Sequence, residues 1–174
     1  MRIAVATLAA LMFASPVYAG QPVTAQISVC FTPAEQCEGR IVEAIDRAQS
    51  SIRVQAYGFT SLPIIHALQR AAERGIEVLA ILDKTNERKY SGATLLDAAG
   101  IPVWIDSEPA IAHNKIMVID ERLTSGGSYN YTAAAQKRNA ENVTFMENAE
   151  IARQFIANWD SRLNVSRVFE VARP

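Results

Sequence analysis

The sequence predicts an α/β domain in which a mixed β-sheet lies between helices. The first observation is the order of patterns, since segments with strand periodicity alternate with segments of helical periodicity. The second is residues 76–83, IEVLAILD, whose nearly continuous apolar run is typical of a buried strand in a parallel sheet. The third is size, because 174 residues with 49% hydrophobic and 20% charged side chains suffice for one domain with its own core.

Strands and helices alternate in the first half of the chain. Residues 26–31, QISVCF, alternate between polar and apolar side chains and predict the first strand. The helix at 33–49 begins at a Thr-Pro pair and places its apolar side chains on one face. Residues 51–59, SIRVQAYGF, predict the second strand, and the helix at 62–74 ends at Gly75.

The second half continues the same order. The strand at 76–83 is followed by a polar loop at 84–92 and by a short helix at 93–99, which again ends before a glycine. A turn at 120–122 leads to a short strand. The other elements expected here are strands at 101–106, 115–120 and 142–146, the last strand, and a closing helix at 149–163.

The first twenty residues, MRIAVATLAALMFASPVYAG, have the pattern of a secretory signal peptide. Arg2 supplies a positive start, residues 3–14 are apolar, and small residues precede a cleavage site near Ala19. The alternatives are an amphipathic helix or a membrane anchor, but this run is too short for a bilayer of about 30 Å. We therefore expect a signal peptide at 1–19, a mature domain at 20–174, a periplasmic or secreted location and no stable membrane association.

The two cysteines are close together in the sequence. Cys30 and Cys37 enclose six residues, so they can form a small-loop disulfide in an oxidising compartment. Two free buried thiols are the alternative. A zinc site is disfavoured because no histidine or further cysteine lies nearby.

A histidine and a lysine stand at the start of a strand that otherwise has the composition of a core strand. His113 and Lys115 are two residues apart, so their side chains point to one face of the sheet, with Cβ atoms about 7 Å apart. Asn114 points the other way. The apolar run 116–119 anchors the strand and holds the polar pair on a rigid element.

Further polar residues follow a glycine pair. Gly127 lets a ligand approach the backbone, and Ser128 and Asn130 offer a hydroxyl and a carboxamide on one face. With the imidazole and the ammonium, these groups suit a phosphodiester, since they supply a nucleophile or acid, a cation and neutral donors. Each residue alone is weak evidence for such a site, whereas their spacing is informative.

The spacing forms one long pattern: His113-x-Lys115, four residues, Asp120, six residues, and Gly127-Ser128-x-Asn130. This pattern resembles the signature of the phospholipase D superfamily. The resemblance extends to Glu141, eleven residues past Asn130, and overall the chain is similar to the small secreted bacterial endonucleases of the superfamily over residues 25–163. It implies the phospholipase D-like fold with one motif per chain.

The resemblance implies a two-step displacement. His113 attacks the phosphorus atom and forms a phosphohistidine, while a second histidine protonates the leaving oxygen and later activates water. Lys115, Ser128 and Asn130 bind the phosphate oxygens, so neither a metal nor another cofactor is needed.

Two acidic residues have other roles in the family. The resemblance makes Asp120 mainly structural, linking strands near the site, and makes Glu141 the residue that orients the catalytic histidine. The candidate catalytic set is therefore His113, Lys115, Asp120, Ser128, Asn130 and Glu141.

The family chemistry needs two motifs, and this chain has one. The other histidine, His66, lies in a predicted helix and lacks a lysine two residues on. We therefore expect a homodimer in which the His113 residues of two chains meet across a two-fold axis.

Several residues are candidates for a nucleic-acid groove. The formal net charge is −1, so binding needs a local basic patch. The candidate substrate-binding residues are Lys84, Arg88, Lys89 and Gly127, with Lys137 and Arg138 as further cations and Tyr90, Tyr129 and Tyr131 as stacking groups. A solvated loop and an ordinary helix face are the alternative interpretation.

A nonspecific endonuclease acting on DNA or RNA is the leading hypothesis, because phosphate contacts confer affinity without sequence preference. One alternative is a lipid phosphodiesterase, although such members of the superfamily are generally longer and carry two motifs. Another is a non-enzymatic binding module, which has no need of the nucleophile. Turnover of an activated phosphodiester distinguishes an enzyme from a binder.

Overall fold

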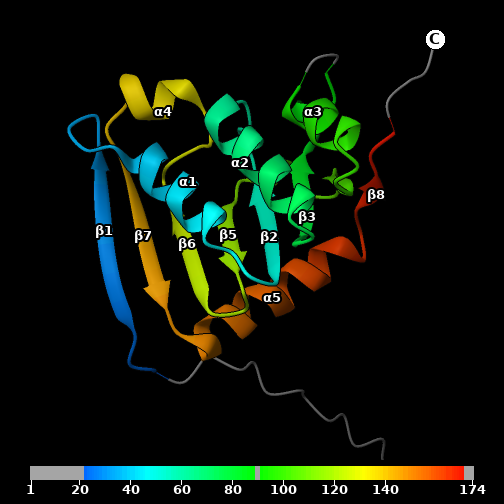
Figure 1. The fold of residues 1–174 in the computed structure, drawn as a ribbon. Helices are drawn as coiled ribbons and strands as arrows, with labels where there is room; N and C mark the ends of the chain where they lie inside the picture. Colours follow the sequence, from blue (N-terminus) through cyan, green and yellow to red (C-terminus); the bar gives the residue numbers. More distant parts are fainter. Residues whose placement is uncertain (1–21, 89–90, 171–174) are drawn as a thin grey trace, which may run out of the picture.

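The predicted mixed sheet is confirmed by the computed structural model, which describes residues 22–88 and 91–170. One eight-stranded sheet has the order β1-β7-β6-β5-β2-β3-β4-β8 (Figure 1). Its strands are β1 (Gln26–Thr32), β2 (Ser51–Ala56), β3 (Glu77–Asp83), β4 (Val103–Asp106), β5 (Lys115–Ile119), β6 (Leu123–Gly127), β7 (Glu141–Glu147) and β8 (Arg167–Val168). The helices are α1 (Cys37–Asp46), α2 (Leu62–Glu73), the 3-10 turn η1 (Lys84–Asn86), α3 (Gly92–Ala98), α4 (Ala133–Lys137) and α5 (Ala149–Leu163).

The strand directions place five strand ends at one edge of the sheet. Strands β2, β3 and β4 run parallel, so α2 and α3 serve as their crossover connections. Strand β5 runs antiparallel to both β2 and β6, and β7 runs antiparallel to β6. The ends of β2, β3 and β6 therefore meet the beginnings of β5 and β7 at the same edge.

Helices cover both faces of the sheet. Helices α1, α2 and α3 lie on one face and α5 crosses the other (Figure 1). On the α5 side, Trp159 is 2% exposed and donates its indole N–H to the Val54 carbonyl at 2.9 Å. Alternating apolar side chains of β2 pack against α1 and α2 on the other side, where Ile52 and Ile45 are fully buried. Strand β2, next to the candidate site, is therefore almost completely buried.

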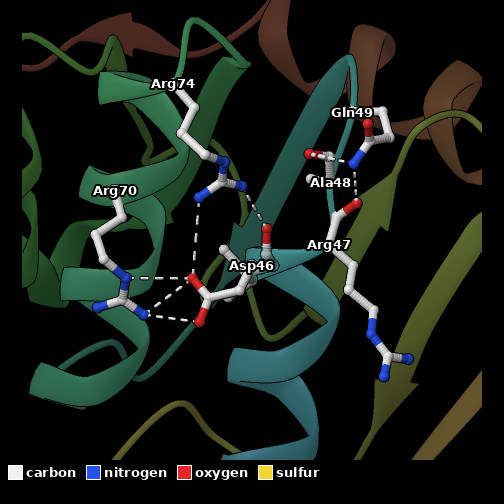
Figure 2. A network of polar contacts seen from close by, with 7 residues as sticks. Asp46, Arg47, Ala48, Gln49, Arg70 and Arg74 are labelled. Atoms are coloured by element: carbon white, nitrogen blue, oxygen red, sulfur yellow. Dashed lines mark hydrogen bonds and ion pairs between the residues drawn. The ribbon is translucent and has the colours of Figure 1, made fainter.

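Helices α1 and α2 are joined by ion pairs at their ends. Asp46 accepts hydrogen bonds from Arg70 at 2.9 Å and lies 3.9 Å from the guanidinium of Arg74 (Figure 2). Arg74 also donates to the Ile45 carbonyl at 3.2 Å. Exposed pairs of this kind contribute little free energy, so the buried apolar contacts between the helices dominate their association.

The first helix starts later than predicted. Residues 33–36 precede it in a turn, in which the Glu35 N–H donates to the Phe31 carbonyl, and α1 begins at Cys37. The expected disulfide is present, with a Cα–Cα distance of 5.6 Å between Cys30 and Cys37. A bridge this short needs the chain to reverse within six residues, and a helix from residue 33 would prevent that reversal.

Three short elements were not expected from the sequence. The prediction that 142–146 is the last strand is wrong, because β8 pairs with β4 after the closing helix. A two-residue strand has no periodicity from which to predict it. Thr132 caps α4 by accepting from the Ala135 N–H at 3.2 Å. Asp83 caps η1 in the same way, because its side chain accepts from the Thr85 N–H.

The predicted signal peptide at 1–19 lies outside the described residues. Within residues 22–88 and 91–170, each helix is too short or too polar to cross a bilayer.

Candidate active site

His113 immediately precedes β5, which lies between β2 and β6 and begins beside the ends of both strands. Lys115 is the first residue of β5 and pairs with Ala56, the last residue of β2. His113 lies just before the strand and is exposed, whereas Lys115 is only 7% exposed. The Tyr57 N–H donates to the Asn114 carbonyl at 2.8 Å and so continues the β2–β5 pairing past the strand itself.

The ammonium of Lys115 is held inside the end of the sheet. Its Nζ donates to the His113 carbonyl at 2.8 Å and lies 5.3 Å from the ring centroid of Tyr57. Burial lowers the pKa of Lys115, and the negative charge of Glu141 partly opposes this change. Lys115 and Glu141 therefore interact across the space at this edge, although they come from different strands.

Ser128 and Glu141 are directly connected. The Ser128 hydroxyl donates to Glu141 Oε2 at 2.6 Å and accepts from the Asn142 N–H at 3.1 Å. Glu141 Oε1 accepts from the side chain of Asn139 at 2.9 Å. Among the described residues of this one chain, Glu141 has no hydrogen bond to His113. The orienting role of Glu141 thus stays a prediction, because Glu141 does not contact His113 through a hydrogen bond within one chain.

Gly127 and Asn130 define the other boundary of the site. A Cβ atom at Gly127 would lie 2.4 Å from the Asn142 carbonyl oxygen, and φ at Gly127 is +154°, so a side chain is excluded there. Asn130 accepts from the Gly58 N–H at 3.3 Å, beside the end of β2. Tyr129, between Ser128 and Asn130, points inward and is 1% exposed. This alternation agrees with the expected placement of Ser128 and Asn130 on one side.

Asp120 lies at the opposite end of β5 from His113. The expectation that it links strands near the site needs correction, because five residues of strand, roughly 17 Å, separate it from the start of β5. Its carboxylate accepts from the Ser50 N–H at 2.8 Å and the Ser51 N–H at 3.1 Å, and also from the Gln49 N–H. Asp120 thus fastens the turn between α1 and β2, which is a structural role.

Asp120→Asn is expected to lower the free energy of unfolding by about 1–2 kcal/mol at pH 7. Burial alone would raise the pKa of Asp120, but the backbone N–H groups of Ser50, Gln49 and Ser51 outweigh it and lower the pKa below its usual value. Asparagine tolerates the φ of +53° at this position, so the substitution removes the charge and one of the two acceptor oxygens without straining the backbone.

The sign of the pH dependence follows from the lowered pKa. Ionised Asp120 stabilises the folded chain above the unfolded pKa of about 3.9, and this contribution is lost as pH falls through the lower folded value. Urea unfolding of both proteins between pH 7 and 3 measures the difference, which should become smaller toward the acidic end. A difference that stays constant down to pH 3 would contradict the assignment.

The candidate substrate-binding residues are only partly brought together. Lys84 and Arg88 are exposed, and Lys84 Nζ donates to the Pro109 carbonyl at 3.3 Å, close to the His113 segment. Lys89 and Tyr90 lie outside the described residues. The expected stacking role of Tyr129 and Tyr131 is contradicted, because these side chains are 1% and 2% exposed and belong to the core.

Two residues near His113 were not singled out from the sequence. Tyr57 follows β2, and its ring centroid lies 4.8 Å from that of His113. Asp83 ends β3, is 1% exposed, and accepts from the Ala112 N–H at 2.8 Å. A carboxylate at the end of an apolar strand was the available signal for Asp83. No local pattern indicates Tyr57, because its contacts depend on the β2–β5 pairing.

Comparisons with known proteins agree with this geometry. A family model described as "Cardiolipin synthase, PLD-like domain" matches residues 41–163. A phospholipase D of Rickettsia felis is 46% identical over 138 residues, which cover 79% of this chain and 69% of the relative. The human mitochondrial cardiolipin hydrolase is 30% identical over 128 residues, 72% of this chain and 50% of its own length.

Solved structures give the same result for the fold. The crystal structure of Nuc from Salmonella typhimurium, a phospholipase D family member, superposes with a TM-score of 0.79 and 30% identity, and covers 85% of this chain and 100% of Nuc. NucT from Helicobacter pylori superposes with a TM-score of 0.77 at 23% identity, covering 84% and 100%, and supports the fold alone. The chain therefore belongs to the phospholipase D superfamily and is a phosphodiesterase of that family with one copy of the motif.

Proposed function

We propose that this protein is a metal-independent endonuclease that cleaves DNA or RNA nonspecifically, through a phosphohistidine at His113 in a site shared by two copies of the chain. The observation that carries the proposal is the arrangement at the edge of the sheet. An exposed imidazole lies beside a buried ammonium whose Nζ is held by a hydrogen bond to the backbone of the same His113.

The chemistry assigns one role to each group. An imidazole nitrogen of His113 attacks phosphorus; the N–P bond forms as the P–O bond to the leaving group breaks. Lys115 neutralises charge on the non-bridging oxygens, and Ser128 and Asn130 add neutral donors. Water then attacks phosphorus, the N–P bond breaks, and the imidazole is released.

A second imidazole is needed on the leaving-group side of this displacement. The chain has two histidines, and His66 is exposed on α2, outside the motif. The His113 of a second chain supplies the proton to the leaving oxygen and takes one from the attacking water in the next step. The homodimer is thus part of the proposed mechanism.

Basic side chains on both sides of the site support a nucleic-acid substrate. Lys84 and Arg88 follow β3, and Lys137 and Arg138 lie at the end of α4; all four are exposed. Both segments lie at the edge of the sheet where β5 begins (Figure 1). A phosphate backbone that crosses the site can contact both groups, which is consistent with binding that ignores base sequence.

A glycerophospholipid is the second candidate substrate. Phe31 and Ile111 are each 52% exposed; Phe31 pairs with Asn142, a neighbour of Ser128, and Ile111 is two residues before His113. Apolar side chains beside a polar site suit an acyl chain. The name of the Rickettsia felis relative, phospholipase D, points the same way.

An oxidising compartment is the proposed location. The Cys30–Cys37 disulfide supports export, since such bonds persist mainly outside the cytosol. Removal of residues 1–19 and release to the periplasm or the medium complete this proposal.

The deciding experiment compares substrates in excess EDTA. Residues 20–174 and His113→Ala are incubated with plasmid DNA, RNA, bis(p-nitrophenyl) phosphate and cardiolipin or phosphatidylcholine vesicles. Cleavage of nucleic acid that survives EDTA and is lost in the variant is the expected result. Hydrolysis of lipid without nucleic-acid cleavage would replace the nuclease by a phospholipase, and loss of activity in EDTA would contradict the metal-independent route.

A further inference from the structure

The ring of Tyr57 contacts both His113 and Lys115. Its ring meets the His113 ring edge to face, at 4.8 Å between centroids and 61° between planes. The same ring lies 5.3 Å from Lys115 Nζ, within the range of a cation–π contact. One aromatic side chain thus lies against both the nucleophile and the cation that binds the phosphate oxygens.

The backbone of Tyr57 is fixed on both sides. Its N–H donates to the Asn114 carbonyl at 2.8 Å, and its carbonyl accepts from Asn86 Nδ2 at 2.7 Å. Asn86 is 5% exposed and also donates to the Asp83 carbonyl at 3.0 Å. The backbone of Tyr57, just past the end of β2, is therefore fixed by hydrogen bonds on both sides, and its ring projects from a fixed point.

The backbone around His113 is held by the same framework. Asp83 Oδ2 accepts from the Ala112 N–H at 2.8 Å, while Oδ1 accepts from the Thr85 N–H at 2.8 Å. Tyr57 holds Asn114, so the residues on both sides of His113 are fixed. In contrast, the His113 side chain is exposed and has no hydrogen bond to any residue within 22–88 and 91–170.

We propose that Tyr57 is a positioning residue whose ring sets the orientation of the His113 imidazole and the Lys115 ammonium for attack on phosphorus. An exposed imidazole with a fixed backbone still has two free torsions, and attack needs the reacting atoms about 3–3.5 Å apart and in line. The Tyr57 ring removes rotamers that it would overlap. This inference rests on the proposed role of His113.

Two variants distinguish the contribution of the Tyr57 ring from that of its hydroxyl group. Tyr57→Leu is expected to lower kcat for bis(p-nitrophenyl) phosphate about 10- to 100-fold, because the imidazole loses its restraint, with KM changed less than about threefold. Tyr57→Phe keeps the ring and should stay within about threefold of wild type in both constants. Phe155→Leu is the matched control, since Phe155 is a partly buried aromatic residue on α5. Unfolding in urea shows that each variant is folded.

The split between kcat and KM distinguishes positioning from a structural role. Single-turnover formation of the phosphohistidine should slow in Tyr57→Leu to the same extent as kcat. If Tyr57→Leu does not fold, Tyr57→Met carries the test, because methionine fills a comparable space without a ring. A folded Leu or Met variant with wild-type kcat would overturn the proposal, as would a Phe variant that is equally impaired.

A readout without turnover keeps this inference separate from the proposed function. NMR spectra of 15N-labelled histidine should show altered or averaged His113 ring signals in Tyr57→Leu, with unchanged signals in Phe155→Leu and for His66 in every variant. A wild-type protein that hydrolyses no phosphodiester would refute the proposed function. Identical His113 signals in Tyr57→Leu and wild type would refute the positioning role, whatever the activity.

Discussion

His113→Ala is expected to lower kcat/KM for phosphodiester hydrolysis by at least about 1,000-fold without loss of the fold. The reason is that the proposed mechanism forms its covalent bond to phosphorus at His113, and triad-type nucleophiles show losses of this size or larger. His113 is exposed and its ring lies against Tyr57, so the free energy of unfolding should change by less than about 1 kcal/mol.

The chain itself offers the control for this variant. His66 is the second histidine, is exposed on α2 and lies outside the motif, so His66→Ala should keep wild-type kcat and KM. Initial rates with bis(p-nitrophenyl) phosphate and urea unfolding curves measure both effects. Equal losses for the two variants, or residual activity of His113→Ala within about tenfold of wild type, would remove His113 from the nucleophile role.

Lys115→Met is expected to lower kcat about 100- to 1,000-fold while leaving the protein at least as stable as wild type. Lys115 is 7% exposed, and burial lowers its pKa, so its charged form carries a cost in the folded state. Methionine has a similar length without the charge and removes that cost. A gain in stability together with a loss of activity would mark Lys115 as a residue kept for function.

The lowered pKa of Lys115 also gives a pH dependence. As pH rises through this lowered value, the ammonium is lost, so activity should fall at a pH below the usual lysine pKa of about 10.4. Over the same range the burial penalty disappears, and the stability of wild type should approach that of Lys115→Met. Rates and urea midpoints from pH 6 to 10 test both trends. A methionine variant that is markedly less stable than wild type would contradict a charge penalty at this position.

The sequence was most informative where the relevant pattern is local. Two-residue spacing placed Ser128 and Asn130 together, and the disulfide between Cys30 and Cys37 followed from their proximity. The sheet was predictable because strands such as 76–83 are nearly all apolar. Most boundaries differ by a few residues, since caps and turns, and not hydrophobic periodicity, decide where an element ends.

The features that the sequence did not predict correctly depend on contacts between segments far apart in the chain. Asp120 directly follows the strand that begins at Lys115, but only its contacts with the α1–β2 turn show what its carboxylate binds. Tyr129 was expected to be available for stacking, yet alternation places it inside when Ser128 faces out. The contacts of Tyr57 exist only because β2 ends where β5 begins.

The proposed sharing of one site by two copies of His113 is tested most directly by a mixing experiment. Wild type and His113→Ala are unfolded, mixed in different ratios and refolded at constant total protein, and hydrolysis of bis(p-nitrophenyl) phosphate is measured in EDTA. If each site needs both imidazoles, activity follows the square of the wild-type fraction, so an equal mixture keeps about a quarter of the activity. Activity proportional to the wild-type fraction, with about half remaining in the equal mixture, would contradict the shared site.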